Sequence, residues 1–222
     1  MRRNRKKIRK PFGSRESPKM ILLVCEGEKT EPNYFREYIN RSRATQVQIK
    51  IFGTGYNTLS LVEETVRLKE KGLKEKEEYD QAWCVFDKDS FSDSLVQQAF
   101  AIAKQNGIDI AYSNECFELW YVLHFQYQQS ALKRDQLVRL VKRLFQENFS
   151  KQYPSTGPVR DHRGYDKADK GIYALLLPHQ DTAIKNAKSL HGTRPTDQPT
   201  ENPSTTVYRL VEELNALFKA DR

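Results

Sequence analysis

Two apolar runs that end in carboxylates constrain most strongly what this chain can fold into. Residues 20–25 form the first run, and Glu26 and a glycine follow it directly. Residues 82–86 form the second run, which ends at Asp87 and, two residues later, Asp89. Short apolar runs bounded by polar residues are typical of buried strands. We therefore expect two strands that each bring acidic side chains to their carboxyl ends.

If these strands are parallel neighbours, their acids meet at the edge of the sheet where open parallel sheets bind ligands. Carboxylates that lie close together repel one another and lose hydration, so they usually persist around a divalent cation. Asp87 and Asp89 are spaced to approach one hard cation, Mg²⁺ or Mn²⁺, and Glu26 would complete its shell or act as a general acid or base. The alternative is that these acids only solubilise the strand ends.

Strand-like and helical patterns alternate along the first 128 residues. Further strands are expected over residues 46–52 and 108–112. Helices are expected over residues 32–42, 59–76 and 93–105. This alternation predicts an α/β fold, with an open parallel sheet flanked by helices on both faces.

The strand signals stop after residue 129, and we expect a helical extension over 129–222 that packs on a core formed by 20–128. Its helices are predicted near residues 137–145, 166–177 and 180–190 and from about Ser204, with the Ser/Thr cluster as a cap.

The segment 114–125, just before this extension, is apolar on nearly all sides and predicts a buried helix. Within it, Glu118 is expected to be a buried acid that needs a partner or a cation. His124 is interpreted as a core histidine rather than as a ligand.

The net charge of +8 resides mostly in the first ten residues, which contain seven Lys or Arg and no acid. We expect residues 1–19 to be a disordered tail and linker that grips phosphate backbones, although a purely solubilising tail is the alternative. A long basic loop over 150–166 is a second candidate contact with DNA or RNA. The candidate nucleic-acid-binding residues are Arg2, Arg3, Arg5, Lys6, Lys7, Arg160 and Arg163.

The cysteines and the hydropathy indicate a cytoplasmic protein. Three cysteines lie in apolar surroundings without a CxxC pair, as is typical of buried thiols in a reducing compartment. No apolar run approaches the length of a membrane span, and no apolar stretch follows the basic N-terminus as it would in a secretory signal.

A glutamate-glycine after the first strand and an Asp-x-Asp after the third resemble the Toprim fold of topoisomerases, bacterial primases and overcoming-lysogenization-defect nucleases. Four blocks resemble more closely the RloB-like proteins, which are linked to restriction and phage-defence loci. These blocks are LLVCEGEKTEPNYF, VFDKDS, SNECFELWYVLHF and NPSTTVYRLVEEL. The resemblance implies a Toprim-like core and an ATPase or restriction partner that gates a toxic activity.

Further site residues come from the resemblance and from the chemistry of phosphate binding. Glu31 would be an additional metal ligand, as the second glutamate is in the lysogenization-defect nucleases, although it follows Glu26 by five residues rather than four. Gly27 and Lys29 are candidates for binding phosphate. Lys167 and Lys170, three residues apart on one predicted helix face, are candidates for stabilising phosphate charge, with surface lysines as the alternative.

Two functions from different classes account for these features. The first is a Mg²⁺-dependent Toprim-type nuclease that acts in phage defence with an ATPase partner. The second is a non-catalytic module of a defence system, with a nucleic-acid-binding or regulatory role. A third reading is a phosphatase, because DKDS resembles the haloacid-dehalogenase nucleophile motif, but that motif belongs after the first strand. No GxxxxGK[ST] motif is present, which argues against ATP hydrolysis by this chain.

Overall fold

The fold is described from a computed structural model of the chain. The structure describes residues 18–149, 166, 169–192 and 201–221. The basic tail up to residue 17 and the basic loop up to residue 165 lie outside the described residues, so the seven nucleic-acid contacts predicted there stay predictions. The same holds for Lys167.

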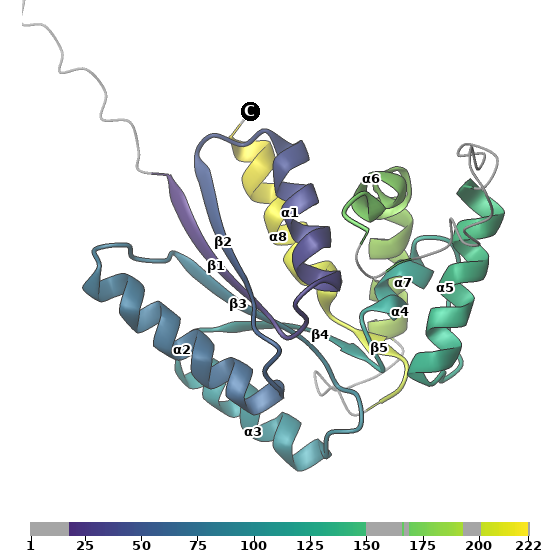
Figure 1. Ribbon diagram of the computed structural model, residues 1–222, viewed down its shortest axis with the longest axis horizontal. Coiled ribbons are helices and arrows are strands. Elements are labelled where there is room, and N and C mark those ends of the chain that lie inside the picture. The colour runs from purple at the N-terminus through teal and green to yellow at the C-terminus, as the bar shows by residue number, and fades with distance from the viewer. Residues whose placement is uncertain (1–17, 150–165, 167–168, 193–200, 222) are drawn as a thin grey trace, which may run out of the picture.

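One five-stranded sheet organises the described chain, in the order β2-β1-β3-β4-β5 (Figure 1). The strands are β1 (Lys19–Cys25), β2 (Val47–Gly53), β3 (Gln81–Asp87), β4 (Asp109–Asn114) and β5 (Ser204–Thr205). Strands β1 to β4 are parallel to their neighbours, and β5 is antiparallel to β4. The predicted α/β fold with a largely parallel sheet is therefore confirmed, and the two acid-bearing strands are direct neighbours.

Helices cover both faces of this sheet. They are α1 (Thr30–Ser42), α2 (Thr58–Lys74), α3 (Asp93–Gln105), α4 (Glu118–Leu123), α5 (Arg134–Phe149), α6 (Ile172–Leu176), the 3₁₀ turn η1 (Leu177–His179), α7 (Gln180–Gly192) and α8 (Val207–Ala220). Helices α2 and α3 lie on one face, and α1 and α8 lie on the other (Figure 1). Helices α4 to α7 gather beyond the β4–β5 side of the sheet.

Alternating strand residues explain the two layers, because successive side chains of a strand point to opposite faces. In β1, Leu22 and Val24 pack into the core shared with α2 and α3. Ile21 and Leu23 pack into the larger core, which continues from α1 through α4, α5 and α7 to α8. The C-terminal helices are thus joined to the sheet through one continuous apolar core.

The C-terminal part differs from the predicted all-helical extension at its end. Ser204 and Thr205 form β5 instead of starting the last helix, and α8 begins at Val207. The Ser/Thr cluster caps α8 in part: the Thr205 hydroxyl accepts a 3.3 Å hydrogen bond from the amide of Val207, whereas Thr206, at the N-cap position, makes no side-chain cap hydrogen bond. Instead, the Thr206 hydroxyl accepts a 3.1 Å hydrogen bond from the backbone amide of Tyr112 in β4. These side chains thus make hydrogen bonds with the backbone at the edge of β4, a contact that sequence periodicity alone does not predict.

Two other predicted helices are shorter than expected. Strand β4 runs to Asn114, so α4 covers only residues 118–123, the middle of the apolar segment 114–125. Helix α6 begins at Ile172, because Asp169 accepts a hydrogen bond from the amide of Gly171 and holds a turn before it. Lys170 therefore lies in a turn and not on a helix face.

The buried segment around α4 otherwise matches the prediction. His124 is 1% exposed, and its Nδ1 atom lies 2.8 Å from the carbonyl oxygen of Trp120. Burial lowers the pKa of His124 to about 3, as expected for a core histidine. Cys25, Cys84 and Cys116 are buried and free, as predicted. No helix in the described part of the chain has the length and apolar character needed to cross a membrane.

Candidate cation and phosphate site

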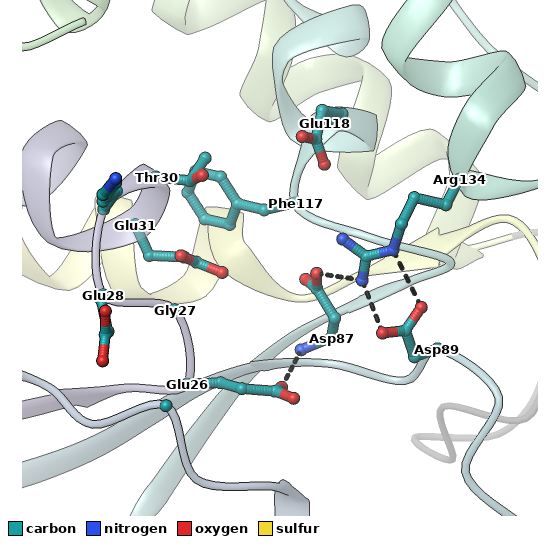
Figure 2. Close-up of a pocket in the computed structure, with 12 residues that line it drawn as sticks. Glu26, Gly27, Glu28, Thr30, Glu31, Asp87, Asp89, Phe117, Glu118 and Arg134 are labelled. Carbon is teal, nitrogen blue, oxygen red and sulfur yellow. Dashed lines mark hydrogen bonds and ion pairs between the residues drawn. The ribbon is translucent and has the colours of Figure 1, made fainter. Parts of the chain in front are cut away.

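A cavity of about 410 Å³ opens at the carboxyl ends of β1 and β3. Glu26 follows β1 directly, Asp87 is the last residue of β3, and Asp89 lies just beyond it; all three line this cavity (Figure 2). The parallel pairing of β1 with β3 brings them together across a sequence separation of about sixty residues, as expected for strand ends at one edge of a sheet.

Glu26 is held by the backbone of the neighbouring strand. Its Oε2 atom accepts a 2.9 Å hydrogen bond from the amide of Asp87. Burial raises the pKa of Glu26 to about 7; repulsion by Asp89 adds to the increase, while the hydrogen bond and Arg134 oppose it. A carboxyl group with this pKa can give or take a proton near neutral pH.

Asp87 is the most buried acid of this trio, at 7% exposed. Burial raises its pKa well above the usual range, and the carboxylates of Glu31, Glu118 and Glu26 add to the increase against the opposing charge of Arg134. Its Oδ1 atom is buried and finds no hydrogen-bond donor among the described residues. Such an oxygen costs free energy unless a cation or a donor satisfies it.

Asp89 is positioned by an unusual backbone conformation. Its φ angle of 48° lies in the left-handed region, which aspartate tolerates better than most residues do. The amide of Asp89 donates a 3.2 Å hydrogen bond to the carbonyl of Glu115. Lys88, between the two aspartates, turns away to an ion pair of 2.9 Å with Asp93.

Arg134, the first residue of α5, is the site residue that the sequence analysis missed. Its Nη2 atom lies 2.8 Å from Oδ2 of Asp87 and 2.7 Å from Oδ2 of Asp89. Its Nε atom donates a 3.0 Å hydrogen bond to Oδ1 of Asp89. Burial opposes its charge, but the two aspartates outweigh this and raise the pKa of Arg134. The acids predicted at the strand ends imply a cationic partner, but the local sequence does not distinguish Arg134 from the other arginines of α5.

Glu31 and Glu118 line the far wall of the cavity. Both are buried, at 4% and 1% exposed, and both repel Asp87. A Cβ atom added to Gly27 would lie 2.2 Å from Oε2 of Glu31. The missing side chain of Gly27 therefore makes room for the Glu31 carboxylate, while its predicted role at a phosphate stays a prediction.

The sequence that forms this site matches a model of a known protein family. The model of the RloB-like protein family matches residues 21–214, which include every acid of the cavity. This chain belongs to the RloB-like protein family. Comparisons of this RloB-like protein with curated proteins and with solved structures give no match.

Of the three candidate lysines of this RloB-like protein, the structure describes Lys29 and Lys170, which lie in different places. Lys29 is exposed at the N-cap position of α1 and lines the cavity beside Thr30. Lys170 is exposed in the turn before α6 and does not belong to the residues that line the cavity. Of these two lysines, only Lys29 is therefore placed to meet a phosphate at this cavity.

The carboxylate oxygens of the site suit a hard cation, but Arg134 occupies the two aspartates that are expected to bind it. Carboxylate oxygens are the ligands that Mg²⁺ and Mn²⁺ prefer, and the Oδ1 atom of Asp87 lacks a partner within the described residues. Yet no three acids, histidines or cysteines of residues 18–149, 166, 169–192 and 201–221 are close enough together to hold a metal ion. Arg134 bridges Asp87 and Asp89, the pair expected to hold the cation.

Proposed function

We propose that this RloB-like protein is a Mg²⁺- or Mn²⁺-dependent nuclease of the Toprim type that acts in phage defence with an ATPase partner. The convergence of Glu26, Asp87 and Asp89 at the ends of two adjacent parallel strands is the observation that carries the proposal. The order of these acids along the chain fits the Toprim resemblance. Resemblance to proteins linked to restriction and phage-defence loci supports the defence role and the partner.

The charge of the cavity supports the need for a cation. Among the described residues that line it, six are acids and two are cationic. A phosphodiester carries a negative charge and would be repelled by this excess. Asp87 and Asp89 would hold the cation, with Glu26 or Glu31 completing the shell. A cation bound there would neutralise phosphate charge and activate water for attack.

The protein's own residues would handle protons and orientation. Glu26 would take a proton from the attacking water or give one to the leaving oxygen, because its pKa of about 7 permits both. The amide of Asp87 fixes the direction of the Glu26 carboxylate during this transfer. Lys29, exposed at the start of α1, would contact the phosphate on the open side of the cavity.

A non-catalytic module that binds nucleic acid is the second candidate. The ion pairs of Arg134 with Asp87 and Asp89 favour it, because they partly neutralise the pair without any metal. In that case the acids would have a structural role, and the basic tail would make the contacts with nucleic acid.

A cleavage assay separates these functions. DNA and RNA, single- and double-stranded, are incubated with the full chain and Mg²⁺ or Mn²⁺, with and without the ATPase partner. Asp87→Asn is compared with Asp135→Asn, an equal charge change at an exposed residue of α5. The nuclease proposal expects metal-dependent cleavage that only Asp87→Asn abolishes. If the chain binds nucleic acid but shows no cleavage that is lost in Asp87→Asn, the non-catalytic module is favoured.

A further inference from the structure

The contact between Arg134 and the Asp87–Asp89 pair has the geometry of a replaceable counter-ion. One guanidinium nitrogen, Nη2, lies within 2.8 Å of an oxygen from each aspartate, as a shared cation would. The side chain of Asp87 is 9% exposed, whereas those of Arg134 and Asp89 are each 35% exposed. Arg134 can therefore leave towards solvent without unpacking the core, while the carboxylate of Asp87 stays behind.

We infer that Arg134 is a built-in competitor of the divalent cation, which occupies the Asp87–Asp89 pair until the cation displaces it. This inference rests on the proposed function and adds a regulatory device to the same site. A divalent cation in place of Arg134 would bind the carboxylate oxygens that now accept hydrogen bonds from the guanidinium, and the buried Oδ1 atom of Asp87 as well. The competition would keep the site unloaded when the cation is scarce.

The charges around the pair explain why the exchange is coupled. If Arg134 left without a replacement, the carboxylate of Asp87 would remain buried in a cavity that Glu31, Glu118 and Glu26 also line. Uncompensated buried charge is costly, so the arginine and the cation exchange rather than leave the pair empty.

The place of Arg134 in the fold links this exchange to the helical part of the protein. Arg134 is the first residue of α5, whereas Asp87 and Asp89 belong to the end of β3 and the turn after it. Helix α5 packs against α4 and away from the sheet (Figure 1). A partner that shifts the start of α5 would withdraw the arginine and raise the affinity of the pair for the cation.

The test is a calorimetric titration of Mn²⁺ into the full chain carrying Arg134→Gln. We expect its dissociation constant for Mn²⁺ to be at least about tenfold lower than that of the wild type, a gain of about 1.4 kcal/mol. Arg139→Gln removes the same charge from the exposed face of α5, where Arg139 pairs with Asp135, and should stay within about twofold of the wild type. Asp87→Asn combined with Arg134→Gln should abolish the gain.

A second control separates competition from simple electrostatics. Lys29→Gln also removes a positive charge from the cavity wall, and we expect it to raise the affinity for Mn²⁺ by less than about threefold. If Lys29→Gln raises the affinity for Mn²⁺ as much as Arg134→Gln does, the gain reflects only the net charge of the cavity, and the inference is overturned. If Arg134→Gln fails to fold by circular dichroism, Arg134→Lys decides the question. Its single ammonium nitrogen cannot reproduce the additional contact of Nε with Oδ1 of Asp89, so competition expects Mn²⁺ binding tighter than that of the wild type here as well.

The outcomes distinguish this inference from the proposed function. Wild-type binding that depends on Asp87, together with equal or weaker binding by Arg134→Gln, overturns the competitor role and leaves the nuclease proposal standing. Absence of Mn²⁺ binding by both the wild type and Arg134→Gln, with and without an oligonucleotide, overturns both.

Discussion

The carboxylate of Glu26, just after β1, accepts a 2.9 Å hydrogen bond from the backbone amide of Asp87, the last residue of β3. This contact ties the ends of two neighbouring parallel strands together at the point where three acids converge. The two carboxylates differ in their hydrogen bonds. That of Glu26 accepts one from a backbone amide, whereas the buried Oδ1 atom of Asp87 accepts none from the described residues.

Glu26→Gln should weaken Mn²⁺ binding while the fold persists. The amide oxygen of glutamine can still accept the hydrogen bond from Asp87, but the variant has lost the charge that attracts the cation. We expect the dissociation constant for Mn²⁺ to rise about tenfold or more, measured by calorimetry. Glu37→Gln, which removes an equal charge from a surface ion pair with Arg41, is the control and should change little. Equal effects of the two variants would contradict a direct role for Glu26.

Two substitutions of Asp89 should separate its carboxylate from its backbone. Asp89→Ala and Asp89→Gly both remove the partner of Arg134, but only glycine adopts a φ of 48° without a steric cost. We expect the glycine variant to be more stable than the alanine variant by about 1 kcal/mol in urea unfolding. Both should lose Mn²⁺ affinity to the same extent. A difference in that affinity would show that the turn itself positions other ligands.

Gly53→Ala should distort the loop that carries Glu26 and Gly27. A Cβ atom on Gly53 would lie 2.7 Å from the carbonyl oxygen of Gly27 and 2.9 Å from the Cα atom of Glu28, which are backbone atoms and cannot rotate away. We expect a loss of about 1–3 kcal/mol in the free energy of unfolding, with weaker Mn²⁺ binding. Gly192→Ala meets nothing within 4 Å and serves as the control. Stability equal to that of the control would mean that the loop yields without cost.

His124 should lower the stability of the fold in mild acid relative to a variant that lacks this histidine. Burial lowers its pKa from 6.5 to about 3, with a smaller contribution from His179, so below pH 6.5 the unfolded chain binds more protons than the folded chain. The stabilisation is complete above this pH and is lost as the pH falls towards 3.

Urea unfolding across this range measures the effect of His124. Between about pH 7.5 and about pH 5.5 we expect His124 to contribute a loss of about 1.4 kcal/mol, measured as the difference from a variant without it, because the raised pKa of Glu26 changes stability in the opposite direction in both proteins. The non-titrating variant His124→Asn, which can still donate to the carbonyl of Trp120, should lack this loss and become more stable relative to the wild type as the pH falls. Parallel profiles for the two proteins would contradict the assignment to His124.

The sequence made part of this site predictable because strand ends are local features. An apolar run that stops at Glu26 and another that stops at Asp87 indicate two buried strands, and parallel strands share one ligand-binding edge. Alternating runs between them predict crossover helices, which explains why the helix over 93–105 is found at its expected bounds. Both inferences need only short-range patterns and the rules of parallel sheets.

The parts that the sequence did not predict depend on contacts between distant segments. Arg134 reaches Asp87 across 47 residues, and its own neighbourhood in α5 resembles that of any amphipathic surface helix. Ser204 and Thr205 become a strand only because the edge of β4 offers them partners, since Thr205 pairs with Ser113. Lys170 fell outside a helix because Asp169 stabilises a local turn. In each case a specific tertiary or side-chain contact outweighed the local pattern.

The most direct test of this account is a crystal of the full chain soaked in Mn²⁺, with anomalous diffraction recorded to locate the ion. We predict an anomalous peak between Asp87 and Asp89 on the side of Glu26, within about 2.0–2.6 Å of their carboxylate oxygens, with Arg134 turned away from the pair. Asp87→Asn crystals treated in the same way should show no such peak. A cavity without a peak, in which Arg134 still bridges the two aspartates at saturating Mn²⁺, would contradict the claim that these strand ends hold a catalytic cation.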